Sequence, residues 1–296
     1  ALFHRRRRCT NRHFHAEITA NSDEPTLTDR PEVKMNSIVV TGATSGIGLE
    51  TVRLLAGEGY HVLAVGHIQT HCEKADRDIR AGIHDAKIEW YAADLMQQRE
   101  VIRVAGEIKS LLDERGDGKL YALINNAGCA RSWYMTTEDG YEQQFALNCL
   151  AGFLLTHELL PYLLKAKGRV IMTSSRSHKG IKVHWDDVML SKRYNPLTAY
   201  KQSKLCNILF AQGLNDLYAS EGLRAYAVDP GLVNTDIGNK TAGIVDFVWR
   251  LRKRHGVSPT VPAKTYSYLC EHTKAPTGLY YYLCKERSYS KQVTSE

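Results

Sequence analysis

The strongest constraint on the fold is a regular alternation of short apolar runs with segments of helical spacing, which starts at Ser37. In one helical segment, Val52, Leu55 and Ala56 recur at the spacing that lines one face of a helix. The predicted strands span residues 37–41, 61–65, 89–92, 122–125, 169–174, 224–228 and 279–283. This alternation predicts an α/β fold, a doubly wound parallel seven-stranded sheet with helices on both faces.

A glycine loop follows the first predicted strand and opens the first helix, in residues 41–48, which read TGATSGIG. Glycines allow a tight turn and let backbone N–H groups approach a pyrophosphate, which a helix N-terminus also attracts. A plain glycine turn is the simpler alternative, but the order of strand, loop and helix favours a dinucleotide site. The predicted contacts are Gly42, Thr44, Ser45, Gly46, Ile47 and Gly48.

The end of the second strand bears on which dinucleotide binds. An acidic residue there hydrogen-bonds the ribose of NAD, whereas this chain reads Gly66-His67-Ile68-Gln69-Thr70. No carboxylate repels a 2′-phosphate, and no arginine binds one. The segment therefore favours NADP(H) over NAD(H). Ser45, His67 and Thr70 are the residues expected to bear on this preference.

Tyr200 and Lys204 lie four residues apart in a segment with helical spacing, so both side chains project from one face. An ammonium beside a phenol stabilises the phenolate, which makes the tyrosine proton available near neutral pH. A half-buried tyrosine beside a solvated lysine is the simpler alternative. The glycine loop upstream favours the acid/base interpretation.

Charge and cysteine patterns exclude several other classes of protein. The net charge is +7, and residues 1–34, with seven Lys/Arg and five Asp/Glu, carry only +2 of it. This charge is too diffuse to predict nucleic-acid binding, although the run Arg5–Arg8 is the feature that favours it. The seven cysteines are scattered, without a Cys-x-x-Cys pair. They predict no disulfide framework, no metal site and a reducing, cytoplasmic location.

The chain divides into a leader and one domain. Residues 1–34 are predicted to be a poorly ordered basic extension, and residues 35–296 a single dinucleotide-binding domain. The most apolar stretch, 147–164, contains Asn148, His157, Glu158 and Pro161. It therefore predicts a buried helix instead of a transmembrane one.

Three motifs in this order resemble the short-chain dehydrogenase/reductase family: residues 41–48, Asn125-Asn126-Ala127-Gly128 and Tyr200-x-x-x-Lys204. The resemblance covers about residues 36–286. Further segments are similar to the retinol-dehydrogenase-like branch, namely 176–199, 200–210 (YKQSKLCNILF) and 278–285. The resemblance implies a Rossmann-like fold and an NAD(P)-dependent oxidoreductase that interconverts an alcohol and its ketone or aldehyde by hydride transfer. The alternative is a non-catalytic, redox-sensing scaffold that binds the cofactor.

The resemblance also assigns catalytic roles. Tyr200 would transfer the proton and Lys204 would lower its pKa and hold the nicotinamide ribose. Asn148 would connect Lys204 to water, and Ser175 would hydrogen-bond the substrate oxygen. Ser174 and Ser177 are the alternatives to Ser175. His178, which follows them, is expected to be a lining or surface residue.

Further cofactor contacts follow from the same resemblance. Asp94, with Leu95, would contact the adenine, and a helix N-cap is the simpler role for Asp94. Asn126, Ala127 and Gly128 would line the cofactor cleft. The residues expected to hold the nicotinamide carboxamide follow the sixth strand: Pro230, Gly231, Val233 and Thr235.

Apolar side chains gather in the loops 129–137, 183–197 and 238–257, with Trp133, Trp185 and Trp249 among them. They predict a lipophilic alcohol or carbonyl compound as the small-molecule substrate, with 238–257 as a lid, and ordinary packing is the alternative. The basic residues of 244–255 favour peripheral contact with an anionic membrane, or only a solvated face. By analogy with relatives, a homodimer is expected.

Overall fold

The computed structural model describes residues 36–115, 117–233, 256–271 and 275–293. The predictions for residues 1–34, for Thr235 and for the lid 238–257 up to residue 255 lie outside them. All seven predicted strands are present, and an eighth, β8, was not predicted. The strands are β1 Ser37–Thr41, β2 His61–Gly66, β3 Ile88–Ala92, β4 Ala122–Asn125, β5 Arg169–Thr173, β6 Arg224–Val228, β7 Tyr280–Tyr282 and β8 Lys285–Glu286.

The strands form one sheet in the order β3-β2-β1-β4-β5-β6-β7-β8. Every pair is parallel except β7 and β8, which are antiparallel. The chain runs outward in one direction from β1 and in the other from β4. Ligands bind outside the carboxyl ends of the strands at such a switch point. The fold therefore places a candidate site beside Thr41 and Asn125.

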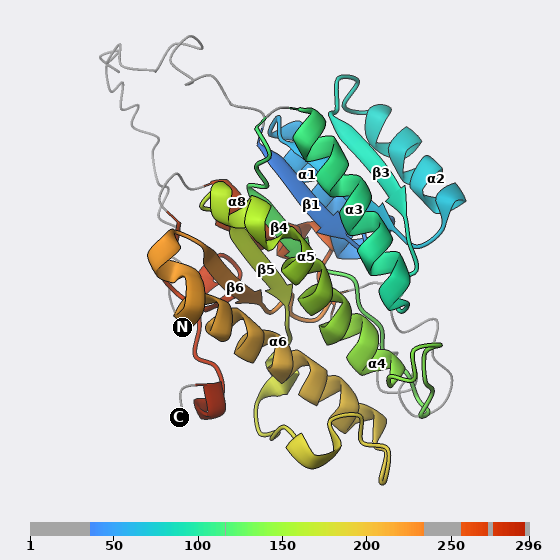
Figure 1. The fold of residues 1–296 in the computed structure, drawn as a ribbon, viewed down its shortest axis with the longest axis vertical. Helices are drawn as coiled ribbons and strands as arrows, with labels where there is room; N and C mark the ends of the chain where they lie inside the picture. The colour runs from blue at the N-terminus through green and yellow to red at the C-terminus, as the bar shows by residue number, and fades with distance from the viewer. Residues whose placement is uncertain (1–35, 116, 234–255, 272–274, 294–296) are drawn as a thin grey trace, which may run out of the picture. The chain divides into compact units, whose positions relative to one another are not determined.

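Helices cover both faces of the sheet (Figure 1). They are α1 Gly46–Gly57, α2 Gln69–Arg80, α3 Gln98–Glu114, α4 Gln143–Phe145, α5 Ala151–Lys165, α6 Pro196–Tyr218 and α8 Thr260–Glu271. Apolar residues of α3, α5 and α6 pack on one face, and those of α1, α2 and α8 on the other. Because strand side chains alternate, Val39 faces the first group while Ile38 and Val40 face the second. Both faces of β1 are thus buried.

The helical stretch that ends in α5 begins differently from the prediction. Ala146–Leu150 form a π-helix, η1, and α5 starts only at Ala151. A π-turn carries one more residue than an α-turn and leaves backbone groups free for other partners. The Asn148 carbonyl oxygen accepts a hydrogen bond from Asn207 Nδ2 of α6 at 2.8 Å. The prediction of a regular helix that begins at residue 147 is therefore wrong at the start of the helix.

The same stretch, Gln143–Lys165, is the one helix of the described residues that is long and apolar enough to cross a membrane. Of its most apolar window, 44% is buried inside the protein. Leu155, Leu159 and Leu163 are fully buried in the core on the sheet. Core helices have the same length and composition, and this packing is that of a core helix.

Candidate active site

The glycine loop lies close against the start of α1. Gly42 has φ +67°, a conformation that side-chain-bearing residues rarely adopt. A Cβ on Gly48 would lie 2.1 Å from the Gly42 carbonyl oxygen. Only glycine at position 48 permits this approach. The first backbone N–H groups of α1 have no acceptors within the helix, because they belong to its first turn.

Thr41, at the end of β1, ties the loop to the turn after β4. Its Oγ1 accepts hydrogen bonds from the backbone nitrogens of Asn126 and Ala127, both at 3.0 Å. Asn126 Nδ2 donates in return to the Thr41 carbonyl oxygen at 3.0 Å. The two motifs therefore form one rigid floor. Sequence reasoning included Thr41 in the loop but missed this function, which a hydroxyl at the end of a central strand could have signalled.

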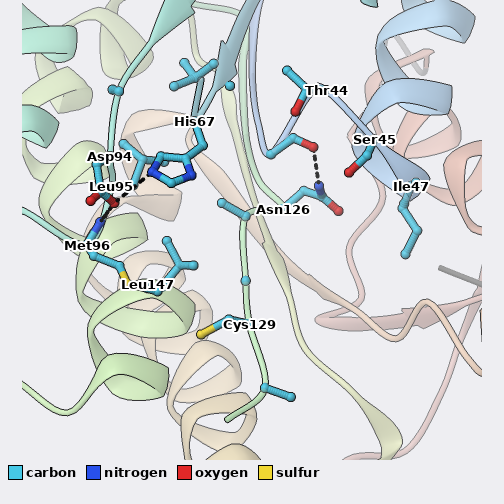
Figure 2. A pocket seen from close by; sticks show the side chains of 18 of the residues that line it. Thr44, Ser45, Ile47, His67, Asp94, Leu95, Met96, Asn126, Cys129 and Leu147 are labelled. Carbon is cyan, nitrogen blue, oxygen red and sulfur yellow. Dashed lines mark hydrogen bonds and ion pairs between the residues drawn. The ribbon is translucent and has the colours of Figure 1, made fainter. Parts of the chain in front are cut away.

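A cavity of about 390 Å³ lies above this floor (Figure 2). The predicted residues that line it are Gly42, Thr44, Ser45, Gly46, Ile47, His67, Asp94, Leu95, Asn126, Ala127 and Gly128. Lining residues that were not predicted are Val65, Gly66, Ala93, Met96, Cys129, Ala130, Arg131 and Leu147. Most of these neighbour a predicted site residue, and Cys129, Ala130 and Arg131 belong to the loop 129–137, which was predicted to contact the substrate instead of the cofactor.

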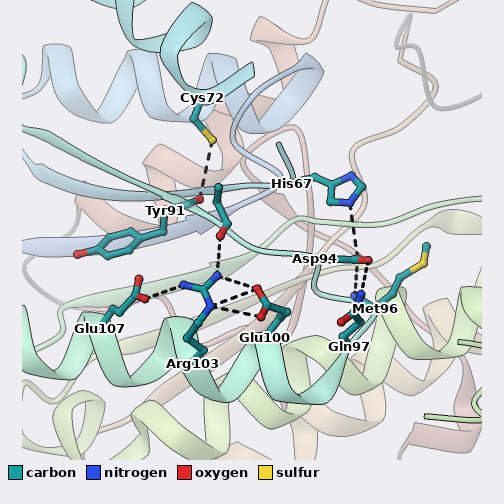
Figure 3. A network of polar contacts seen from close by, with 10 residues as sticks. His67, Cys72, Tyr91, Asp94, Met96, Gln97, Glu100, Arg103 and Glu107 are labelled. Atoms are coloured by element: carbon teal, nitrogen blue, oxygen red, sulfur yellow. Dashed lines mark hydrogen bonds and ion pairs between the residues drawn. The ribbon is translucent and has the colours of Figure 1, made fainter. Parts of the chain in front are cut away.

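His67 and Asp94 form one end of the cavity, at the carboxyl ends of β2 and β3 (Figure 3). His67 Nε2 lies 3.8 Å from Asp94 Oδ1, an ion pair when the imidazole is protonated. The Asp94 carboxylate accepts hydrogen bonds from Met96 N at 3.1 Å and Gln97 Nε2 at 3.2 Å. The N-cap of α3 is Gln97, so the N-cap role considered for Asp94 is wrong. Asp94 instead closes a turn before the helix.

Helix α6 begins where its sequence requires and brings Tyr200 and Lys204 to the end of β5. Asn195 caps it, with Oδ1 accepting from the nitrogens of Leu197 and Thr198 at 3.0 Å. Lys204 Nζ lies 5.5 Å from the centroid of the Tyr200 ring. The same Nζ donates to the Thr173 carbonyl oxygen at 3.1 Å.

Lys204 is only 4% exposed, so the alternative of a solvated lysine is wrong. Burial lowers the pKa of Lys204 to about 8, because an ammonium without water is costly, and the nearby Cys129 and Cys149 raise it only in part. The site thus holds a buried cation beside a phenol, and this cation keeps its proton below a pH of about 8.

Asn148 links the turn after β4 to α6. Its Oδ1 accepts from Cys129 N at 2.7 Å, and its Nδ2 donates to Cys129 O at 3.0 Å and to Ser203 Oγ at 3.1 Å. Asn207, which was not predicted, donates from Nδ2 to the carbonyl oxygens of Asn148 and Thr173, at 2.8 and 2.9 Å. The amides of Asn148 and Asn207 thereby fix the surroundings of Lys204.

The three serines after β5 have different partners. Ser174 is buried and its Oγ donates to the Lys204 carbonyl oxygen at 2.7 Å, so this hydroxyl already has a structural function. Ser175 is partly exposed. Its Oγ accepts from Ser177 N at 3.2 Å and from Ser177 Oγ at 3.0 Å. Its own hydroxyl proton stays available to a ligand, which separates Ser175 from Ser174.

His178 was expected to be a lining or surface residue, and this expectation is wrong, since its exposed fraction is 0%. It closes the 3₁₀ turn η2, Arg176–His178.

The predicted nicotinamide loop does not line the cavity in the described residues. Gly231 N donates to Asp229 Oδ1 at 2.9 Å, and Val233 is buried and pairs with Val257. Pro230, Gly231 and Val233 thus lie at the carboxyl end of β6, next to β5, without reaching the cavity.

Aromatic side chains are exposed in the predicted substrate loops. Trp133 is 58% and Trp185 73% exposed. Tyr134 packs edge-on against Tyr194 with ring centroids 5.3 Å apart. The two loops therefore present apolar surface to their surroundings.

The residues present fit a dinucleotide. Any side chain on Gly42 or Gly48 would meet the backbone or Asn126 at 3.0 Å or less. Gly46 and Ile47, the first residues of α1, line the cavity, so the helix begins at the cavity wall. Its first turn carries no acidic residue. Amides at a helix N-terminus bind phosphate.

Comparison with known proteins agrees with this geometry. The short chain dehydrogenase family model matches residues 36–243. Retinol dehydrogenase 12 of Mus musculus is 35% identical over 262 residues, which cover 88% of this chain and 81% of the mouse protein. Polyprenol dehydrogenase of Homo sapiens is 35% identical over 221 residues, which cover 72% of this chain and 64% of the human protein.

Solved structures share the fold. An alcohol dehydrogenase from the archaeon Thermococcus sibiricus, complexed with 5-hydroxy-NADP, superposes with a TM-score of 0.65 at 18% identity. The match covers 86% of this chain and 100% of the archaeal one.

The family model and the curated relatives show the family of this chain. NAD(P) is the cofactor typical of short-chain dehydrogenases. The chain therefore belongs to the short-chain dehydrogenase family, in its retinol-dehydrogenase-like branch, as an NAD(P)-dependent enzyme that acts on alcohols.

Proposed function

We propose that this enzyme interconverts a lipophilic alcohol and its aldehyde or ketone, with NADP(H) as the favoured cofactor and Tyr200 as the acid/base. The observation that carries the proposal is the buried ammonium of Lys204, 5.5 Å from the Tyr200 ring centroid. A cation in a dry site stabilises the phenolate far more than one in water, because little solvent screens it.

The residues of the site divide the chemistry between them. NADP(H), when bound, supplies the hydride acceptor or donor. Tyr200 gives its phenolic proton to the substrate oxygen during reduction and takes it back during oxidation. Ser175 Oγ donates to the same oxygen, where charge develops. Asn148 and Lys204 hold the surroundings of Tyr200, and Lys204 would also bind the nicotinamide ribose.

The preference for NADP(H) rests on the end of β2. Gly66 and His67 line the cavity there, in a position where a carboxylate would bind ribose hydroxyls and repel a 2′-phosphate. An imidazole can donate to phosphate oxygens. Asp94 would contact the adenine, and both of its oxygens also accept hydrogen bonds from the turn before α3.

Two observations support a lipophilic substrate. Trp133 and Trp185 expose large apolar surfaces in the predicted substrate loops, and the related mouse and human proteins are named for retinol and polyprenol, both lipophilic alcohols. We further propose, from the cysteine pattern and the basic residues of 244–255, that the enzyme lies in the cytoplasm or at the surface of an intracellular membrane. That it forms a homodimer is proposed by analogy with relatives.

The test follows NADPH and NADH absorbance separately against retinal, a steroid ketone and a long-chain aldehyde, for wild type and Tyr200→Phe. We expect turnover of at least one carbonyl with NADPH, and loss of turnover in Tyr200→Phe with NADPH binding nearly unchanged. A fully active Tyr200→Phe would contradict the acid/base assignment. A wild type that binds NADPH but reduces none of the carbonyls would favour the non-catalytic scaffold.

A further inference from the structure

His178 is buried although Arg176 and Lys179, close to it in the chain, are exposed. Both of its ring nitrogens have backbone partners. Nδ1 lies 2.6 Å from the Ser175 carbonyl oxygen, and Ser290 N lies 3.2 Å from Nε2. A backbone N–H can only donate, so Nε2 must be the acceptor and must carry no proton. The proton of the neutral ring is therefore on Nδ1, which donates to the Ser175 carbonyl oxygen.

The surroundings keep this ring neutral and fixed in orientation. Burial lowers the pKa of His178, because the charged imidazolium loses its water. The Tyr280 ring packs against the imidazole at a centroid distance of 5.0 Å and an interplanar angle of 66°. His178 thus has one donor and one acceptor, and both are engaged by backbone groups.

The acceptor side of His178 is held by a distant part of the chain, residues 288–293. Ser290 is 112 positions from His178. Lys179, which follows His178 in the chain, contacts the same segment: its Nζ donates to Ser288 Oγ at 3.3 Å. Tyr289 and the buried Val293 join the apolar core that α6 and β7 share. The 288–293 segment therefore connects the loop after β5 to the helix that carries Tyr200.

The donor side of His178 controls the backbone of Ser175. The Ser175 carbonyl oxygen accepts two hydrogen bonds from His178, from the backbone nitrogen at 3.1 Å and from Nδ1 at 2.6 Å. These bonds fix the ψ angle of Ser175, 149° in an extended conformation. Rotation about this bond sets the direction of the Cα–Cβ bond relative to the carbonyl, and Ser177 N, which donates to Ser175 Oγ at 3.2 Å, holds the hydroxyl on that Cβ.

We propose that His178 is a positioning residue: it transmits the anchoring of the 288–293 segment to Ser175 and so places the Ser175 hydroxyl opposite Tyr200. This inference rests on the proposed function, in which Ser175 donates to the substrate oxygen. His178 touches neither substrate nor cofactor. Without the Ser290 N–H, the imidazole loses one of the two backbone contacts that orient it, and the constraint on Ser175 weakens.

The decisive pair of variants is Ser290→Pro and Ser290→Ala in the full chain. Both lose the serine hydroxyl, but only proline removes the N–H that His178 accepts. With retinal or the best carbonyl of the panel, we expect kcat to fall at least about tenfold in Ser290→Pro and less than about twofold in Ser290→Ala, because misplaced catalytic groups lose rate steeply. NADPH affinity should stay unchanged in both. Equal kcat values for the two variants would overturn the proposal.

Variants of His178 test whether the segment acts through the ring. The amide of asparagine can replace Nδ1–H but not the Nε2 acceptor, so His178→Asn should retain more kcat than His178→Phe. In the His178→Asn background, Ser290→Pro should cause no further loss, since residues that act through one contact are not additive. A full additional tenfold loss there would show that the segment acts by another route.

A spectroscopic measurement tests the contact between Ser290 and His178 independently of activity. In wild type, ¹⁵N NMR of histidine-labelled enzyme should show one histidine with a protonated Nδ1 and an unprotonated Nε2, and the Nε2 signal should shift in Ser290→Pro but not in Ser290→Ala. An inactive wild type, or an active Tyr200→Phe, counts against the proposed function. A correct tautomer with no kcat difference counts against the positioning role alone.

Discussion

The contact between Gly48 and the glycine loop gives a sharp prediction for Gly48→Ala. The added Cβ would lie 2.1 Å from the Gly42 carbonyl oxygen and 2.7 Å from Asn126 Nδ2, whereas real Cβ contacts stay above 3.0 Å. The carbonyl must therefore move by the difference, 3.0 − 2.1 = 0.9 Å. Such overpacking costs about 1–3 kcal/mol, and the better helix propensity of alanine returns about 1 kcal/mol.

We therefore expect Gly48→Ala to be destabilised by roughly 0–2 kcal/mol, with a larger effect on cofactor binding. Moving the loop takes its amides away from the pyrophosphate. Losing one hydrogen bond to a charged group, about 1.5–3 kcal/mol, weakens binding by roughly 10- to 150-fold. NADPH fluorescence titration measures this loss, and urea unfolding measures the stability.

Gly106→Ala in α3 is the matched control, because nothing lies within 4 Å of the Cβ it would add. It should be stabilised by about 0.5–1 kcal/mol and bind NADPH as wild type does. If Gly48→Ala gains the same stability and keeps its NADPH affinity within twofold, the close approach of loop and helix does not govern the site.

Two further predictions concern charge at the two ends of the site. Burial lowers the pKa of Lys204 to about 8, so the ammonium is present below that pH and lost above it; kcat/KM for the cofactor, which reports on the free enzyme, should fall as pH rises through about 8. A flat profile from neutral pH to well above that pKa would argue against a charged Lys204 in catalysis. At the other end, His67→Asp should lower the preference for NADPH over NADH at least about tenfold by repelling the 2′-phosphate, while His71→Asp, on exposed surface outside the cavity, should not. Equal effects of the two aspartates would mean that His67 does not contact the phosphate.

The fold was predictable because its central strands, β1, β2, β4 and β5, are buried on both faces and most of their residues are apolar. Ser37–Thr41 and Ala122–Asn125 begin and end where predicted. β8 was missed because two residues, Lys285 and Glu286, carry no pattern. The π-helix was missed because its residues continue the helical spacing of α5, and only the contact of the Asn148 carbonyl with Asn207 distinguishes it.

The site shows the same division between local and long-range features. The glycine loop and the Tyr200/Lys204 pair depend on residues close in sequence, so their spacing predicts their geometry. The roles of Thr41, Asn207 and His178 depend on partners from other strands or loops. A histidine beside serines gives no sign of its burial, because the covering segment lies 112 residues away.

The short strand β8 has a consequence for how the enzyme behaves at high concentration. It pairs through Lys285 and Glu286 with Tyr282 and Tyr281 of β7. Without it, a run of three tyrosines would offer its backbone groups as a template to the edge strand of another molecule. β8 consists of two exposed residues of opposite charge. Such a strand is too short and too well hydrated to pair with a strand of another molecule. β8 therefore blocks edge-to-edge aggregation on this side of the sheet.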